Sequence, residues 1–263
     1  MPRPLITLTT DFGLSDHFVG VMKGVIFSIA PAARVIDISH GVEPYNIAEG
    51  AFTIAQAYRY FPKKTIHVVV VDPGVGSTRR PLLAEAAGQH FIAPDNGVLS
   101  MLLGREQTAR VRHITAEKYF LHPVSRTFHG RDVFSPVAAH LAAGIAPAKF
   151  GRRIEDYLRA SFDQPAKTGP RAWTGSILKA DHFGNLATNF HIDHFPAIRT
   201  HAFTIRVGAR PIARLALTFS ECPPGELFAI VGSSGYVEIA VSEGSAARTL
   251  GCGPGAPVEL TIG

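Results

Sequence analysis

The stretch TIHVVVV (Thr65–Val71) says more about the fold of this chain than any other. It is an almost unbroken apolar run, and a strand has this composition when helices cover both faces of the sheet that contains it. Such strands are typical of α/β proteins with parallel sheets. The run therefore predicts a central strand that is buried on both faces.

The sequence on either side of this run alternates between strand-like and helix-like stretches. Pro31 and Pro62 end two amphipathic stretches, as expected for residues that cannot continue a helix. The expected strands are residues 5–9, 34–38, 90–93 and 109–114, and the expected helices are residues 16–30, 46–61 and 98–103. Residues 1–150 are therefore predicted to form an α/β domain with a mostly parallel sheet.

The rest of the chain has a different pattern. Residues 151–171 are charged, contain proline and have no clear period, so they are interpreted as a linker. Short apolar runs separated by Gly and Pro then predict strands at residues 176–180, 202–207, 214–219, 227–231, 236–241 and 258–262, with a short helix at 245–250. Residues 172–263 are therefore predicted to form a small all-β, barrel-like domain.

Composition excludes several classes of protein. With 46% hydrophobic and 18% charged residues among 263, the chain has the make-up of an ordinary globular protein. No run approaches the roughly 20 apolar residues of a membrane span, and no signal peptide is visible, so a cytoplasmic protein without a membrane partner is expected. The two cysteines lack the spacing of a zinc site. The net charge of +5 comes from scattered basic residues, so no nucleic-acid partner is expected.

Aspartates follow three of the expected strands, where open α/β sheets bind their ligands. A single aspartate at such a place is more often a turn or cap residue, but its recurrence at several strand ends favours a site. The polar residues concerned are Asp11 and Asp16 after the first strand, Asp72, Arg79 and Arg80 after the central strand, and Asp95 and Asn96 after residues 90–93.

The stretch TFHGRDVFSP (Thr127–Pro136) adds a histidine, His129, at a loop-to-helix boundary, where catalytic groups are often held. Two kinds of site fit these residues. One is a metal-dependent hydrolase with Asp11, Asp72 and His129 as ligands. The other is a metal-free site in which an aspartate, an arginine and a histidine surround a water molecule. The spacing does not choose between them.

Seven motifs, in one order, resemble those of the S-adenosylmethionine (SAM) hydroxide adenosyltransferases, or SAM hydrolases, relatives of the SAM-dependent fluorinase and chlorinase. The resemblance extends from about Ile6 to Leu260 and includes both halves of the chain. The motifs are TTDFG, PYNIAEGAF, VVDPGVG, APDNG, TFHGRDVFSP, DHFGN and SSGYVEIA.

This resemblance implies hydrolysis of SAM to adenosine and L-methionine, without a metal or cofactor, in a homotrimer that binds SAM between subunits. It implies Asp72, Arg79 and His129 as catalytic residues, with Arg80 as an alternative to Arg79. The implied substrate-binding residues are Asp11 at the ribose, Asp16 and Asp181 at the methionine ammonium, Tyr45 against the ligand, Phe183 and Asn185 at the adenine, and Ser233 and Ser234 at the methionine carboxylate.

The chemistry of a sulfonium substrate suits these residue types. The leaving thioether is neutral and needs no acid, so the site must chiefly present a water in line with the C5′–S bond. An arginine favours the developing hydroxide and a histidine can take the proton.

Other functions remain open on the sequence alone. In the halogenases the His-Gly pair of the FHGRD stretch is altered, and the fluorinase has serine at the position of Gly130. Since this chain keeps both His129 and Gly130, water is expected over a halide. Outside the family, the alternatives are the metal-dependent hydrolase and a nucleoside-binding module without turnover.

Overall fold

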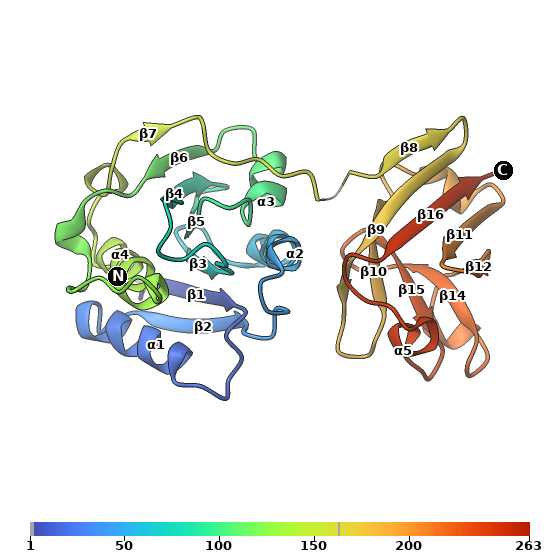
Figure 1. Cartoon of the computed structure of the whole chain (residues 1–263), viewed down its shortest axis with the longest axis horizontal. Coiled ribbons are helices and arrows are strands. Elements are labelled where there is room, and N and C mark those ends of the chain that lie inside the picture. The colour runs from blue at the N-terminus through green and yellow to red at the C-terminus, as the bar shows by residue number, and fades with distance from the viewer. Residues whose placement is uncertain (1–2, 163) are drawn as a thin grey trace. The chain divides into compact units, whose positions relative to one another are not determined.

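The computed structural model describes residues 3–162 and 164–263, which divide into two compact units, Met1–Ala160 and Ser161–Gly263. Figure 1 shows helices and strands in the first unit and mainly strands in the second. Residues 151–160 of the expected linker belong to the first unit, where β7 (Arg153–Ile154) pairs with β6 (Arg110–His113).

The first unit contains one seven-stranded sheet in the order β2-β1-β3-β5-β4-β6-β7. Its other strands are β1 (Leu5–Thr10), β2 (Arg34–Ser39), β3 (Ile66–Val70), β4 (Pro81–Ala86) and β5 (Gln89–Pro94). Its α-helices are α1 (Phe18–Ile29), α2 (Ile47–Ala57), α3 (Ser100–Arg105) and α4 (Ser135–Ala142), and its short helical turns are η1 (Tyr58–Tyr60), η2 (Glu117–Tyr119), η3 (Gly130–Phe134) and η4 (Pro147–Lys149).

The prediction of a mostly parallel sheet is confirmed only in part, because this sheet is mixed. The pairs β1–β2, β1–β3 and β3–β5 are parallel, whereas β4–β5, β4–β6 and β6–β7 are antiparallel. The difference lies in β4, which the sequence analysis missed. Its sequence, PLLAEA, lacks β-branched residues, and it is joined to β5 by a tight turn in which Ala87 and Gly88 both have positive φ. A two-residue turn of this kind makes an antiparallel hairpin.

The central strand is buried as the sequence predicted. All five residues of β3 are buried. Val68 and Val70 belong to a core that includes residues of α1 and α4, among them Met22, Ile26 and Val137. On the other face α2 packs so closely that a Cβ on its Gly50 would lie 2.9 Å from Val71. Helices therefore cover both faces, and the loops at the carboxyl ends of β1 and β3 leave the same edge of the sheet.

The second unit contains a nine-stranded sheet in the order β12-β11-β16-β9-β10-β15-β14-β13, with β8 also paired to β9. It curls around a core that includes Phe190, Ile205, Val237 and Leu260. Its elements are β8 (Ala166–Gly169), β9 (Ala172–Ala180), β10 (Leu186–His191), β11 (Phe203–Val207), β12 (Arg210–Ile212), β13 (Leu215–Ala216), β14 (Leu227–Val231), β15 (Tyr236–Val241), β16 (Pro257–Ile262), α5 (Ala246–Leu250), η5 (Pro196–Arg199) and η6 (Phe219–Glu221).

The all-β character of this unit agrees with the prediction, but a closed barrel is not formed. Within the described residues, the end strands β12 and β13 do not pair with each other. The strands β8, β10 and β12 were not predicted from the sequence. The strand β13 is shorter than the predicted residues 214–219, because a turn at Phe219–Glu221 follows it. The result is an open, strongly curled sheet.

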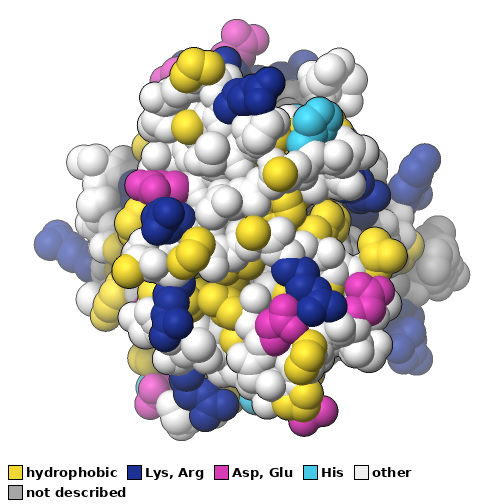
Figure 2. All heavy atoms as spheres, turned by 90° about the vertical axis from the view of Figure 1, so that its right-hand side faces the viewer, with side chains coloured by type: hydrophobic (Ala, Val, Ile, Leu, Met, Phe, Trp, Pro, Cys, Tyr) yellow, Lys and Arg dark blue, Asp and Glu magenta, His cyan; other side chains and the backbone are white. Residues whose placement is uncertain are grey.

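The surface of the second unit mixes residue types. Figure 2 shows one face of it, where hydrophobic, basic and acidic side chains lie interspersed. In the described part of the chain, no helix combines the length and the hydropathy needed to cross a membrane.

Candidate active site

The loop after β3 brings Asp72 and Arg79 together. Arg79 Nε donates to Asp72 Oδ1 at 2.9 Å, and Arg79 Nη2 donates to Asp72 Oδ2. Both side chains are almost fully buried, with 8% and 4% of their surfaces exposed for Arg79 and Asp72 respectively. A bidentate pair of this kind fixes the plane of the guanidinium group, because two parallel hydrogen bonds allow it little rotation.

His129 completes this cluster from a distant part of the chain. It directly precedes η3, a π-helical turn that leads into α4. Arg79 Nη2 lies 2.8 Å from His129 Nδ1. Since arginine can only donate, Nδ1 must be unprotonated, and the proton of the neutral ring is on Nε2. Burial and the positive charge of Arg79 lower the pKa of His129, so the ring is neutral at pH 7.

Arg79 keeps one unused donor at this cluster. Its Nη1 is buried and has no hydrogen-bond partner among the described residues. Arg79 and His129 both line a pocket of about 430 Å³, whose other walls include Thr115, Phe120 and Val124. A buried guanidinium nitrogen without a partner is rare in folded proteins, and it marks a place for a water molecule or another acceptor.

Asp11 lies close to Asp72, because β1 and β3 are neighbouring parallel strands. Burial raises the pKa of Asp11, and the negative charge of Asp72 adds to this effect. The backbone N–H of Tyr45 donates to Asp11 Oδ2 at 2.9 Å. Tyr45 itself has a φ of 68° and a side chain that is 74% exposed. A non-glycine residue in this strained conformation, with its ring in solvent, is typical of a binding site.

Asp16, by contrast, is exposed and makes no hydrogen bond or ion pair with the described residues. The structure therefore does not tie Asp16 to the cluster around Asp72.

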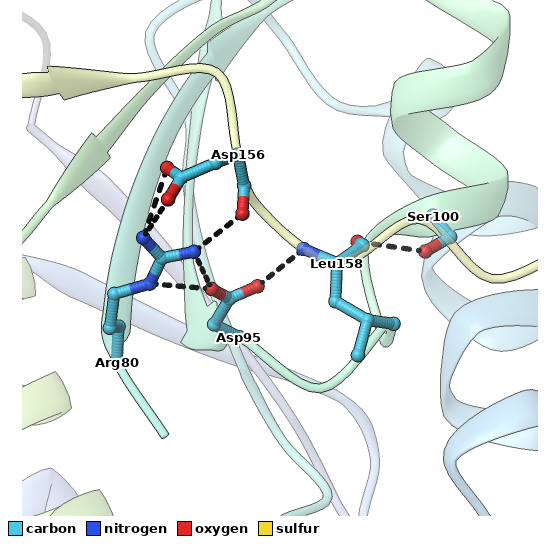
Figure 3. Close-up of polar contacts among 5 residues, drawn as sticks. All are labelled: Arg80, Asp95, Ser100, Asp156 and Leu158. Carbon is cyan, nitrogen blue, oxygen red and sulfur yellow. Dashed lines mark hydrogen bonds and ion pairs between the residues drawn. The ribbon is translucent and has the colours of Figure 1, made fainter. Parts of the chain in front are cut away.

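Arg80 points to different partners from its neighbour Arg79. Figure 3 shows its guanidinium group between Asp95 and Asp156. It also donates to the backbone oxygen of Asp156 at 2.7 Å, while Asp95 accepts from the backbone N–H of Leu158 at 2.8 Å. Arg80 and Asp95 thus hold the last residues of the first unit against the sheet. Their hydrogen-bonding groups are used in this network, which leaves Arg79 as the arginine beside His129.

Gly76, in the VVDPGVG motif, keeps the two parts of the site together. It has a φ of 76°, and a Cβ placed on it would lie 2.1 Å from the carbonyl oxygen of Arg126, three residues before His129. The loop that carries Arg79 therefore packs directly on the segment that carries His129. This close approach is the structural reason for a glycine at position 76.

We expect Gly76→Ala to destabilise the protein by about 2–4 kcal/mol, because it adds both backbone strain and a clash with backbone. Gly74→Ala is the matched control, since a Cβ there meets nothing closer than Ser77 Oγ at 3.4 Å. Thermal unfolding of both variants checks this. A Gly76→Ala protein as stable as Gly74→Ala would contradict the proposed packing.

The expected substrate residues of the second unit lie on two turns. Asp181 accepts hydrogen bonds from the backbone of Phe183 and Asn185 and from Asn185 Nδ2, so it shapes the DHFGN turn. This turn leaves the ring of Phe183 74% exposed. On the other turn, Ser233 is exposed, whereas Ser234 Oγ is buried without a partner among the described residues.

The metal-ligand alternative does not fit this geometry. Both oxygens of Asp72 and Nδ1 of His129 already bind Arg79, and the guanidinium charge would repel a cation. Among the residues that the structure describes, no group of three His, Cys, Asp or Glu side chains is placed to hold a metal ion.

Sequence reasoning missed two supporting residues. Phe134 lies under Arg79, with its ring centre 5.2 Å from the guanidinium carbon. Asp132 is fully buried and accepts from the Ser125 backbone N–H at 2.8 Å, which ties the loop before His129 to η3. Both residues stand in the TFHGRDVFSP motif, so their position there was the available signal.

Comparison with known proteins identifies the family of the chain. The model of the SAM hydroxide adenosyltransferase N-terminal domain matches residues 6–151, and that of the C-terminal domain matches residues 175–259. An (R)-S-adenosyl-L-methionine hydrolase of Salinispora arenicola is 40% identical over 99% of this chain and 98% of its own. A fluorinase of Nocardia brasiliensis is 27% identical in an alignment that covers 99% of this chain and 98% of the fluorinase. The crystal structure of an uncharacterized conserved protein from Thermotoga maritima superposes with a TM-score of 0.90 and a sequence identity of 36%. The match covers 97% of this chain and 99% of the Thermotoga chain.

Proposed function

The chain belongs to the SAM hydroxide adenosyltransferase family, and on this premise we propose that it hydrolyses SAM to adenosine and L-methionine without a metal or cofactor. The observation that carries the proposal is the guanidinium group of Arg79. It is buried, held by Asp72 and His129, and has a free Nη1 donor. This is the arrangement that a water nucleophile requires.

In the proposed reaction, Arg79 Nη1 donates to the attacking water and stabilises its developing negative charge. The water oxygen attacks C5′ in line with the C5′–S bond, and methionine leaves as a neutral thioether. Asp72 fixes the guanidinium plane. His129 is neutral and accepts the proton of the water at Nδ1, the unprotonated nitrogen of its ring, once this nitrogen exchanges its hydrogen bond from Arg79 Nη2 for one from the water. The negative charges of Asp72 and Asp132 favour the imidazolium that results.

We propose that the substrate residues implied by the family resemblance bind SAM here. Asp11, which lies near Asp72, would accept hydrogen bonds from the ribose hydroxyls. The rings of Tyr45 and Phe183 are largely exposed, which suits stacking on a ligand. Asp16, Asp181, Asn185, Ser233 and Ser234 would bind the methionine and adenine ends. We further propose a homotrimer, located in the cytoplasm, in which a neighbouring subunit supplies the residues of the second unit.

A halogenase is the chief alternative. A halide site needs hydroxyl and amide donors and no base. Here His129 supplies a base, and Gly130 is buried with no side-chain donor. A Cβ on Gly130 would lie 3.1 Å from the Phe128 ring, so the packing also leaves little space for a serine.

The test is to incubate the metal-stripped protein with SAM in halide-free buffer and identify the products by mass spectrometry. We expect adenosine and methionine, and a loss of both in His129→Ala. Product that forms only after chloride or fluoride is added would establish halogenation, and the absence of turnover in both buffers would establish a binding module.

The pH dependence of this reaction follows from the lowered pKa of His129. Only the neutral ring can accept the proton, so kcat should be constant from pH 7 upward and should fall only at a pH below the ordinary titration range of histidine. A pH profile of kcat checks this. An acid limb above pH 7 would exclude His129 as the base.

A further inference from the structure

Glu238, in the SSGYVEIA motif, is a half-buried acid that the proposed reaction does not use. It lies on β15, where it is paired with Ala187 of β10 on one side and with Ile230 of β14 on the other. A Cβ placed on Gly232 would lie 1.9 Å from Glu238 Oε1. The carboxylate therefore occupies a recess that exists because residue 232 has no side chain and residue 187 has a small one.

The Glu238 carboxylate has no hydrogen bond or ion pair with the described residues. Burial raises the pKa of Glu238, and the nearby charge of Asp181 raises it further. Ser234, on the turn that contains Gly232, likewise has a buried Oγ without a partner. A polar group that is removed from water without a partner is costly in a folded protein unless something else satisfies it.

A cationic donor suits this carboxylate better than any other partner. Two neighbouring carboxylates repel each other, and a positively charged group placed between them removes that repulsion and donates hydrogen bonds to both. Asp181 is one of the two residues, with Asp16, that the family resemblance assigns to the ammonium group of the substrate's amino acid.

We infer that Glu238 binds the α-ammonium group of the SAM methionine together with Asp181, and so determines specificity for substrates that carry an amino acid. This inference rests on the proposed function. In it, Gly232 and Ala187 shape the recess that holds the Glu238 carboxylate in place.

The experiment compares the binding of three ligands to wild type and Glu238→Gln by calorimetry. S-adenosylhomocysteine has the amino acid but no sulfonium, and 5′-methylthioadenosine has neither. We expect Glu238→Gln to weaken the binding of SAM and of S-adenosylhomocysteine about 10-fold or more, as for a lost charge-assisted hydrogen bond. The affinity for 5′-methylthioadenosine should not change. In turnover, KM for SAM should rise with little change in kcat.

Glu259→Gln is the matched control, because Glu259 is an exposed acid on β16 of the same sheet. Gly232→Ala is a second test, since it displaces the carboxylate without changing its charge. Gly232→Ala should weaken the binding of SAM and S-adenosylhomocysteine as Glu238→Gln does.

Equal weakening of all three ligands would place Glu238 at the nucleoside and overturn the inference, as would no weakening at all. A wild-type protein that binds none of them would instead overturn the proposed function.

Discussion

Arg79→Lys should reduce kcat for SAM hydrolysis about 100-fold or more, whereas Arg80→Lys should leave it within a few-fold of wild type. Lysine keeps the positive charge but cannot donate in parallel to both Asp72 oxygens while also reaching His129 Nδ1 and the free position at Nη1. Removing one donor from a site that stabilises a developing oxyanion typically costs about this much.

The comparison is sharp because the two arginines are neighbours in sequence and both form ion pairs. Product formation measured under saturating SAM gives kcat for each variant, and thermal unfolding of both shows that they remain folded. If Arg80→Lys lost activity and Arg79→Lys kept it, the assignment of Arg79 to the water would be wrong.

His67 should make the first unit sensitive to acid. It is fully buried in β3, stacks on Phe91, and is hydrogen-bonded to Thr7 Oγ1 at 2.7 Å and to Gln89 Oε1 at 3.3 Å. Burial lowers the pKa of His67 from 6.5 to about 4. The unfolded chain therefore binds a proton between pH 6.5 and pH 4 that the folded chain does not bind, and stability falls as the pH decreases through this range.

A difference of this size corresponds to about 3 kcal/mol of unfolding free energy that is present above pH 6.5 and lost by about pH 4. Urea unfolding at pH 7 and pH 4.5, followed by circular dichroism at the helix signal, reports mainly on the first unit, which contains α1, α2 and α4.

His67→Gln should be less stable at pH 7 but should lose less stability on acidification than wild type. His17→Gln, at an exposed histidine of the same unit, should behave as wild type. Equal acid sensitivity in all three proteins would contradict the role of His67.

Much of the fold follows from patterns that are local in sequence. The apolar run at residues 65–71 predicted a strand buried on both faces, and β3 is that strand. The strands β14 and β15 have the bounds that alternation of apolar runs and glycine turns predicted. These predictions succeeded because burial on one or both faces imposes a short-range pattern on the chain.

Other features depend on partners that are distant in sequence. β4 has a sequence suited to a helix and becomes a strand because it lies between β5 and β6. The sequence likewise did not distinguish Arg79 from Arg80 as the catalytic arginine. Only the fold separates them, because it places the side chain of Arg79 against Asp72 and that of Arg80 against Asp95.

The amino-acid sequence by itself determined the two kinds of domain, the buried central strand and the set of motifs in which the site residues stand. The tertiary structure decided the mixed order of the first sheet, the contact of His129 with Arg79 and the unpartnered state of Glu238. The physical reason is that hydrophobic periodicity is a property of neighbouring residues, whereas a hydrogen bond between residues 79 and 129 exists only once the chain between them has folded.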